Sequence, residues 1–142
     1  MHLIIYTVGR VRGPGWKDLS DDYLARIRHY VRCDINELKD DNELVRKWPK
    51  SDVTIALEVN GNKLSSVQFA RHLERWSHHG KGQVSLVIGG AEGIPSELSR
   101  RADYLLSLSS MTLPHRLAKV VLLEQVYRAL TIIRGEPYAR ES

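Results

Sequence analysis

The amino-acid sequence predicts an α/β protein in which helices flank a mostly parallel sheet. Short aliphatic runs alternate along the chain with longer segments of helical spacing, an order typical of this class. The run Val84–Ile88 is apolar at all but one position, as expected of a strand buried on both faces of a parallel sheet. No internal repeat or linker interrupts the pattern, so residues 1–142 are expected to form a single domain with a moderate core.

Strands are expected where a short apolar run stops at a turn residue. The first, His2–Gly9, closes at its glycine, and Val11–Gly15 then turns the chain. The Asn60-Gly61 pair is expected to end the strand that begins at Val53. The other expected strands are Asp34–Leu38, Val53–Val59, Val84–Ile88 and Tyr104–Ser107.

Helices are expected where apolar residues recur every three or four positions. The segment Trp16–Tyr30 places leucine, tyrosine and isoleucine along one side at this spacing. Either Ser65 or Ser66 suits the start of the next helix, because a serine hydroxyl accepts from a free backbone N–H. Lys39–Pro49 is polar and favours a helix or a loop. The expected helices are Trp16–Tyr30, Ser65–Trp76, Ser96–Arg101 and Pro114–Ile133.

Composition limits the class of protein. The formal net charge of +4 is spread without a Lys/Arg run, which permits an RNA partner but does not require one. Cys33 is the only cysteine, so a disulfide framework is excluded and a buried, inert thiol is expected. The histidines lack a third ligand at suitable spacing, and no metal is expected. No apolar stretch has membrane-spanning length or signal-peptide character, which favours a cytoplasmic location.

Two apolar runs end abruptly in loops of unusual composition. Val84–Pro95 reads VSLVIGGAEGIP, and Leu106–Leu117 reads LSLSSMTLPHRL. Glycines permit close approach of the backbone to a ligand, and ligands of parallel sheets bind at the carboxyl ends of the strands. The two loops therefore predict one shared pocket for a small cofactor. The alternatives are a tight glycine turn in the first loop, and a helix start capped by Thr112 with Pro114 in its first turn in the second.

The last helix carries apolar residues nearly all round. A helix of this kind is buried on most sides, and a single sheet in so small a chain is not expected to cover it. We therefore expect a homodimer through this helix. Glu124 and Arg128 lie one turn apart and either pair across the helix surface or, at a dimer seam, organise an active site.

Several pieces of the chain resemble a known family. IGGAEG, LSLSSMTLPH, EQVYRA and RGEPY, in this order, resemble the ribosomal RNA large subunit methyltransferase H family, which belongs to the SPOUT class of knotted methyltransferases. The resemblance covers nearly the whole chain, from the N-terminal HLIIYTVG onward. It implies a SPOUT α/β knot, with a mostly parallel sheet, a C-terminal trefoil knot and a homodimer. True knots are nearly absent elsewhere, so no general sequence rule predicts this one.

The resemblance also implies a cofactor and a substrate. The cofactor is S-adenosyl-L-methionine, which Leu57 in TIALEV and Gly90 in GGAEG would contact. The adenine would be wrapped, largely by backbone groups, by Ser109, Ser110, Met111, Thr112, Leu113 and Pro114. The implied reaction is methylation at N3 of a pseudouridine (position 1915) of 23S ribosomal RNA in the assembled ribosome.

Four residues are candidates for the chemistry of such a transfer. A neutral imide nitrogen must lose its proton, and His115 is a candidate base because histidine titrates near neutral pH. A structural hydrogen bond is the alternative role for His115. Arg128 and Arg134 suit phosphates or negative charge developing on the base. Tyr138 could orient the flipped-out uracil ring or, alternatively, pack against a dimer partner.

The C-terminal tail departs from the pattern of the family. Members typically end in PYH and a basic residue, whereas this chain reads Pro137-Tyr138-Ala139-Arg140. Arg140 keeps a basic tail contact with substrate possible, and the missing histidine bears on rate and substrate. Two other classes stay open: a non-catalytic RNA-binding module that retains cofactor binding, and a monomeric, flavodoxin-like nucleotide-binding protein.

Overall fold

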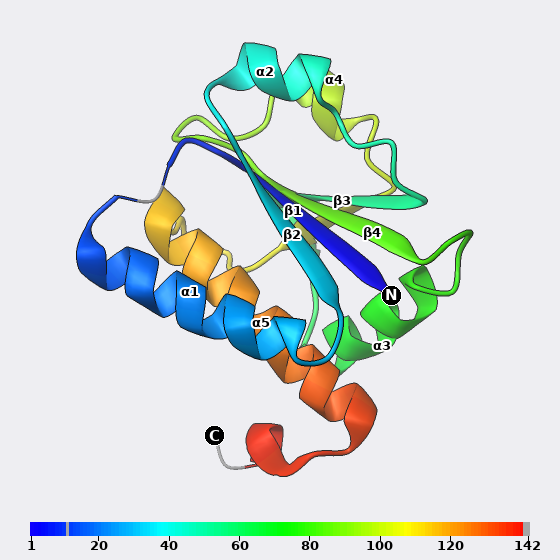
Figure 1. Cartoon of the computed structure of the whole chain (residues 1–142). Coiled ribbons are helices and arrows are strands. Elements are labelled where there is room, and N and C mark those ends of the chain that lie inside the picture. Colours follow the sequence, from blue (N-terminus) through cyan, green and yellow to red (C-terminus); the bar gives the residue numbers. More distant parts are fainter. Residues whose placement is uncertain (11, 141–142) are drawn as a thin grey trace.

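The computed structural model describes residues 1–10 and 12–140, without the side chain of Arg140. Its centre is a five-stranded, wholly parallel sheet in the order β2-β1-β4-β3-β5 (Figure 1). The strands are β1 (His2–Val8), β2 (Arg32–Leu38), β3 (Val53–Lys63), β4 (Gln83–Ile88) and β5 (Tyr104–Ser107). The helices are α1 (Pro14–Arg28), α2 (Asp41–Arg46), α3 (Ser66–Trp76), α4 (Ser96–Ser99) and α5 (His115–Arg134), followed by the 3-10 turn η1 (Pro137–Arg140). The predicted α/β class with a parallel sheet is confirmed.

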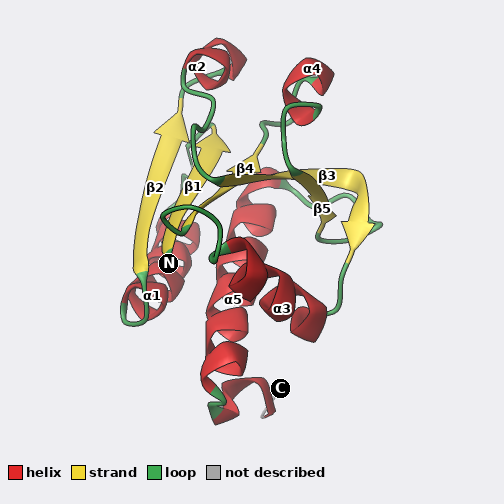
Figure 2. Cartoon of the chain, turned by 90° about the vertical axis from the view of Figure 1, so that its right-hand side faces the viewer, coloured by secondary structure: helices red, strands yellow, loops and turns green. Residues whose placement is uncertain are grey.

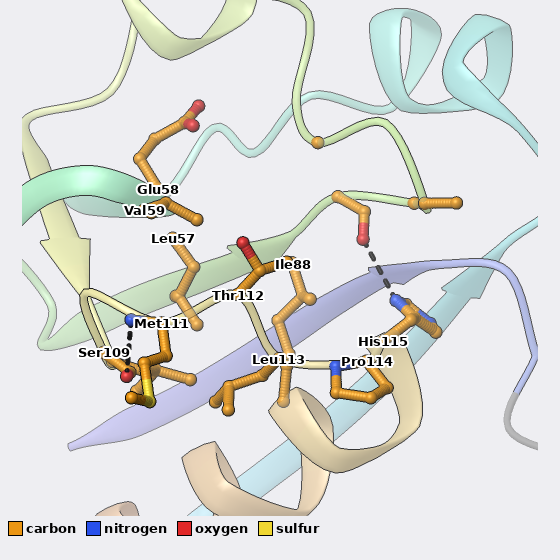
Figure 3. Close-up of a pocket in the computed structure, with 16 residues that line it drawn as sticks. Leu57, Glu58, Val59, Ile88, Ser109, Met111, Thr112, Leu113, Pro114 and His115 are labelled. Atoms are coloured by element: carbon orange, nitrogen blue, oxygen red, sulfur yellow. Dashed lines mark hydrogen bonds between the residues drawn. The ribbon is translucent and has the colours of Figure 1, made fainter.

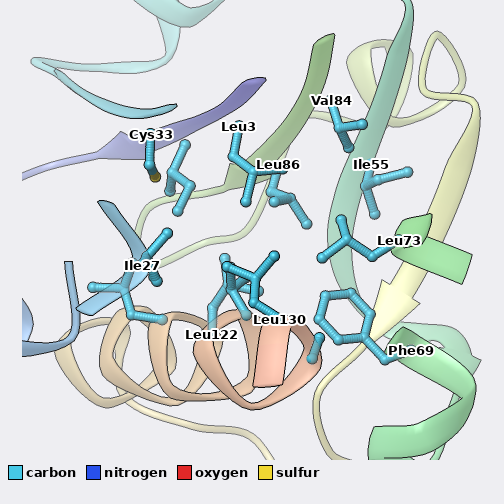
Figure 4. Close-up of a cluster of buried hydrophobic side chains, with 14 of the residues drawn as sticks. Leu3, Ile27, Cys33, Ile55, Phe69, Leu73, Val84, Leu86, Leu122 and Leu130 are labelled. Atoms are coloured by element: carbon cyan, nitrogen blue, oxygen red, sulfur yellow. The ribbon is translucent and has the colours of Figure 1, made fainter. Parts of the chain in front are cut away.

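Helices cover both faces of the sheet. The long helices α1, α3 and α5 lie on one face, and the short helices α2 and α4 lie on the other (Figures 1 and 2). The larger core joins alternate residues of the strands, such as Leu3 and Leu86, to Leu122 and Leu130 of α5 (Figure 4). The intervening strand residues, such as Val87, face Leu44 of α2 in the second core. This two-sided burial explains why β4, near the middle of the sheet, is buried and apolar at most positions.

Local sequence signals account for the helix starts. Ser65 accepts a hydrogen bond from the backbone N–H of Gln68, and the Gln68 side chain accepts from the backbone N–H of Ser65. This capping box begins α3 at Ser66, in agreement with the prediction. Pro14 occupies the first turn of α1, which therefore starts within the stretch predicted as a turn and ends at Arg28.

One strand boundary was predicted wrongly. The Asn60-Gly61 pair does not end β3, which continues to Lys63 through an irregularity in its pairing with β5. Leu106 pairs with Leu57 before the irregularity and with Asn62 after it. A Cβ at Gly61 would lie only 2.8 Å from the backbone carbon of Leu105, so glycine here permits close approach of two strands. The Asn60-Gly61 pair, which was expected to form a turn, thus permits a bulge-like distortion within the strand.

The argument from α5 to a dimer rested on a wrong premise. Leu122, Val126 and Leu130 of α5 are at most 3% exposed, because the sheet, α1 and α3 of the same chain enclose them. A strip that includes Leu117 and Val121 is only half-buried. The homodimer and the C-terminal knot stay predictions.

Three further expectations concern Cys33, membrane-spanning helices and metal ligands. Cys33 lies on β2 and is 2% exposed, as predicted, and burial raises the pKa of its thiol to about 12. Within residues 1–10 and 12–140, no helix is long and apolar enough to cross a membrane. The same part of the chain holds no group of three or more His, Cys, Asp or Glu side chains placed to bind a metal ion.

Candidate functional site

A cavity of about 480 Å³ lies at the carboxyl end of β4 and beside the middle of β3, next to the loop that joins β5 to α5 (Figure 3). Both loops singled out in the sequence line it, which bears out the prediction of one shared pocket. Of the residues expected to bind a cofactor, the lining contains Leu57, Gly90, Ser109, Met111, Thr112, Leu113 and Pro114. Ser110 lies in the same loop but is not among the lining residues.

The glycines of the first loop serve different purposes. A Cβ at Gly89 would lie 2.5 Å from the backbone carbon of Gly93, where the loop returns on itself. Gly93 has a φ of +81°, a conformation that other residues rarely adopt. Both therefore serve the tight turn that was the alternative interpretation. Gly90 is different, because a Cβ there would meet Val8 at ordinary distances, 3.4 Å from its side chain and 3.9 Å from its backbone oxygen. Its bare backbone is available to the cavity.

The second loop is shaped by hydroxyl groups. Ser107 donates to the carbonyl of Ser109 over 3.0 Å, and the Ser109 hydroxyl accepts from the Met111 N–H over 2.9 Å. These bonds curve the chain around the cavity, while the Met111 side chain is 79% exposed. Thr112 is not the helix cap, because α5 starts after Pro114 and has no side-chain cap. The alternative that Thr112 is mere helix-start chemistry is therefore wrong.

His115 joins the two loops. Its Nδ1 lies 3.1 Å from the Gly89 carbonyl oxygen (Figure 3). Because a carbonyl only accepts, Nδ1 carries the proton and Nε2 of the neutral ring carries a lone pair. In the part of the chain that the structure describes, Nε2 is buried and has no hydrogen-bond partner. The side chain thus makes the structural hydrogen bond and also presents an unused acceptor.

Sequence reasoning missed part of the cavity wall. The further lining residues are Glu58, Val59, Ile88, Gly89, Ala91, Gly93, Leu108 and Ala118. Glu58 directly follows Leu57 on β3, and its carboxylate accepts from the hydroxyl of Ser99 at α4. The signal available in the sequence was its position beside Leu57, just before the expected end of the strand at Val59, because ligands of parallel sheets bind near strand ends.

The other catalytic candidates gather at the far end of α5. Arg128 pairs with Glu124 over 2.8 Å, and the Tyr138 hydroxyl donates to the same carboxylate over 2.8 Å. The Arg128 guanidinium also lies 5.1 Å from the centre of the Tyr138 ring, which packs edge-on against Tyr127. Burial, helped by hydrogen bonds to Glu124 and Tyr23, raises the pKa of Tyr138. Tyr138 is therefore a neutral hydrogen-bond donor here.

Arg134 lies nearby but contacts a different ring. Its guanidinium is 5.6 Å from the centre of the Tyr30 ring, and Tyr30 in turn donates to Glu136. The side chain of Arg140 lies outside the described residues. The tail and the end of α5 thus form one polar cluster, which we call the tail cluster: Glu124, Arg128, Tyr138 and the Tyr23 and Tyr127 rings.

The chain does not bring its catalytic candidates together. His115 and Arg128 are thirteen positions apart on one helix. At 1.5 Å per residue they are separated by about 20 Å along the helix axis. His115 lies at the cavity, whereas Arg128 and Tyr138 lie in the tail cluster. A single copy therefore keeps the candidates in two separate groups, which we call the half-sites.

Comparison with known proteins identifies the class. A family profile described as "Predicted SPOUT methyltransferase" matches residues 1–139. The chain belongs to the SPOUT methyltransferases and, within them, to the family of ribosomal RNA large subunit methyltransferase H. The relative of that name from Sorangium cellulosum is 46% identical over 98% of this chain and 99% of its own length. The protein of the same name from Acetivibrio thermocellus is 36% identical over 99% of this chain and 100% of its own length.

Solved structures share the fold at low sequence identity. A "probable methyltransferase" from Bordetella pertussis has a TM-score of 0.60 at 10% identity and covers 91% of this chain and 94% of its own. A SpoU methyltransferase from Streptomyces viridochromogenes, in complex with the cofactor AdoMet, has a TM-score of 0.52 at 9% identity. That match covers 95% of this chain and 61% of the other. The expectation of S-adenosylmethionine as cofactor is supported by such neighbours, one of which was solved with it bound.

Proposed function

We propose that this protein is an S-adenosylmethionine-dependent methyltransferase that acts on large-subunit ribosomal RNA. The proposed target atom is N3 of a pseudouridine in the assembled ribosome, and the proposed location is the cytoplasm. The observation that carries the proposal is the cavity between the Gly89–Gly93 loop and the Ser109–Pro114 loop, in a chain whose relatives are named ribosomal RNA large subunit methyltransferase H.

The cavity fits the cofactor in size and in lining. About 480 Å³ lies within the range of pockets for ligands of this size. Leu57, Ile88 and Leu113 offer an apolar surface to an adenine ring, and the two loops offer backbone N–H and carbonyl groups to its edges. Gly90 lets the backbone approach the ligand closely. When bound, the cofactor supplies an activated methyl group on a sulfonium, so the protein needs no covalent nucleophile.

The residues of the chain then have two tasks. The loops orient donor and acceptor, because an in-line transfer depends on alignment. His115 removes the N3 proton, since its Nδ1–H is engaged by Gly89 and its Nε2 lone pair is unused. The Gly89 hydrogen bond also holds the imidazole in the tautomer that a base requires.

The two half-sites favour a homodimer. If Arg128 and Tyr138 act on the substrate, a second copy must bring its tail cluster to the cavity, because one copy keeps them apart. The half-buried strip of α5 that includes Leu117 and Val121 lies between the two half-sites and is proposed as the contact. Arg128 would face the charge that develops on the base, and Tyr138 would orient the ring.

Ala139 supports one alternative, a non-catalytic RNA-binding module that retains the cofactor. Transfer of labelled methyl from S-adenosylmethionine to unmodified ribosomes, free subunits and protein-free RNA separates the two. Label at one pseudouridine, in assembled ribosomes alone, is the expected result. Cofactor binding by calorimetry with no label on any of the three RNA samples would contradict the proposed reaction and favour the module.

A further inference from the structure

Three arginines at one side of the cavity have no acidic partner among the residues that the structure describes. Arg10 and Arg12 are exposed in the connection between β1 and α1, and Arg116 is exposed on the first turn of α5. Among residues 1–10 and 12–140, no ion pair joins any of the three to a carboxylate. Arg26 and Arg71, by contrast, pair with acids on their own helices.

Gly9 and Gly13, which lie between β1 and α1, are close to the start of α5. A Cβ at Gly13 would be 4.0 Å from Nη1 of Arg116, and a Cβ at Gly9 would be 3.8 Å from Nε2 of His115. Both glycines have φ values above +90°, which lets the connection bend back in this way. The three arginines therefore flank the His115 end of the cavity and not its far end, which Glu58 and Val59 line (Figure 3).

The local backbone adds to the positive potential. Helices α1 and α5 both begin here, and they run side by side from this end (Figure 1). Neither has a side-chain cap or an acidic residue in its first turn, so free N–H groups point outward. The carboxylates on this side, Asp18, Asp21 and Glu37, lie around Lys17, which Asp21 engages directly.

We propose that Arg10, Arg12 and Arg116 form a phosphate-binding surface for the strand of ribosomal RNA that carries the target nucleotide. This inference rests on the proposed function. Guanidinium groups suit phosphate oxygens in geometry and charge, and unpaired ones need no internal ion pair broken before they bind. Placed beside His115, the surface holds the backbone next to the base that enters the cavity. It thus sets the register of the RNA without reading its sequence.

The test compares Arg10→Ala, Arg12→Ala, Arg116→Ala and the triple variant with Arg75→Ala, which removes an exposed arginine on α3. We expect the KM for unmodified ribosomes to rise roughly fivefold for each arginine of the surface, with kcat and cofactor affinity nearly unchanged. The slope of log affinity against log salt, measured by co-sedimentation with ribosomes, should fall by about 0.7–0.9 per arginine. Arg75→Ala should match the unaltered protein in every measurement.

An unchanged KM and salt slope in the triple variant would overturn the inference. Loss of kcat at unchanged KM would overturn it as well, because it would assign the arginines to chemistry and not to binding. Failure of the proposed function gives a different pattern, in which the unaltered protein binds ribosomes but transfers no methyl. In that case the salt dependence of ribosome binding alone tests the phosphate-binding surface. If the triple variant binds ribosomes as tightly as the unaltered protein, with the same salt slope, the surface is refuted.

Discussion

His115 illustrates how one side chain serves both structure and chemistry. Its Nδ1 donates to the Gly89 carbonyl and so ties the start of α5 to the first loop. Its Nε2 is left buried and without a partner within the described residues, an unusual state for a polar atom in a folded protein. An acceptor left free in this way is what a base for the N3 proton requires.

The substitution His115→Asn tests that role. The asparagine amide is expected to keep the hydrogen bond to Gly89 while removing the basic nitrogen. We expect kcat to fall by roughly 10²–10⁴-fold and the acid limb of the pH–rate profile to disappear. Cofactor affinity, measured by calorimetry, should stay within about twofold, because the loop contact is preserved. An unchanged pH–rate profile would show that His115 is structural only.

Tyr138 leads to a prediction about stability at high pH. Burial first, and then its hydrogen bonds, raise the pKa of this phenol above the ordinary value of 10.0. The folded state therefore favours the neutral phenol, and this preference stabilises the fold. The stabilisation is fully present below the pKa of the unfolded state and is lost as the pH rises above that pKa. Tyr138→Phe should make the free energy of unfolding fall less steeply between about pH 9 and pH 11. Urea denaturation at about pH 9 and about pH 11 measures the free energy of unfolding of both proteins. An equal fall with pH in the two proteins would refute the prediction.

At the scale of elements, the first loop combines two kinds of glycine. Gly89→Ala would force a Cβ against the returning backbone of Gly93, so the loop must shift. We expect this substitution to weaken cofactor binding at least tenfold, because the loop wall moves. The Cβ of Gly90→Ala meets only Val8, at ordinary contact distances, so this substitution should change cofactor affinity by no more than a few-fold. Calorimetric titration with S-adenosylmethionine compares the matched pair.

A larger side chain at Gly90 probes the cavity directly. Gly90→Val should abolish cofactor binding while leaving the proposed homodimer intact, since the loop follows β4 and does not lie on α5. Calorimetry and sedimentation velocity measure the two properties. If the valine variant keeps its affinity, Gly90 does not belong to the binding site.

For the whole molecule, the separation of the half-sites leads to a complementation test. His115→Asn impairs the cavity, and Tyr138→Ala impairs the tail cluster. If each site takes its cavity from one copy and its tail from the other, mixed dimers carry one intact site of two. Random exchange of subunits should then restore about a quarter of the unaltered activity. Activity that stays at the sum of the two separate variants would mean that both half-sites act within one copy or that the tail is not catalytic.

Much of the architecture could be predicted from the amino-acid sequence, because the signals involved are local. Apolar periodicity gave all five strands, and the Ser65 cap placed the start of α3. The loops after β4 and β5 could be assigned to one cavity, since the carboxyl ends of parallel strands share an edge. Gly90 and Leu57 followed from motifs matched to the family, and both line that cavity.

Other features depend on which distant segments meet, and residue spacing does not encode this. Gly61 permits a strand distortion and not a turn, because the Leu105 backbone passes beside it. The apolar surface of α5 is enclosed largely by α1 and α3 of its own chain, which its periodicity could not reveal. Glu124 belongs to Arg128 and Tyr138 because the tail folds back along the helix. Short-range patterns specify the elements, whereas long-range packing decides which side chains share an environment and therefore which can act together.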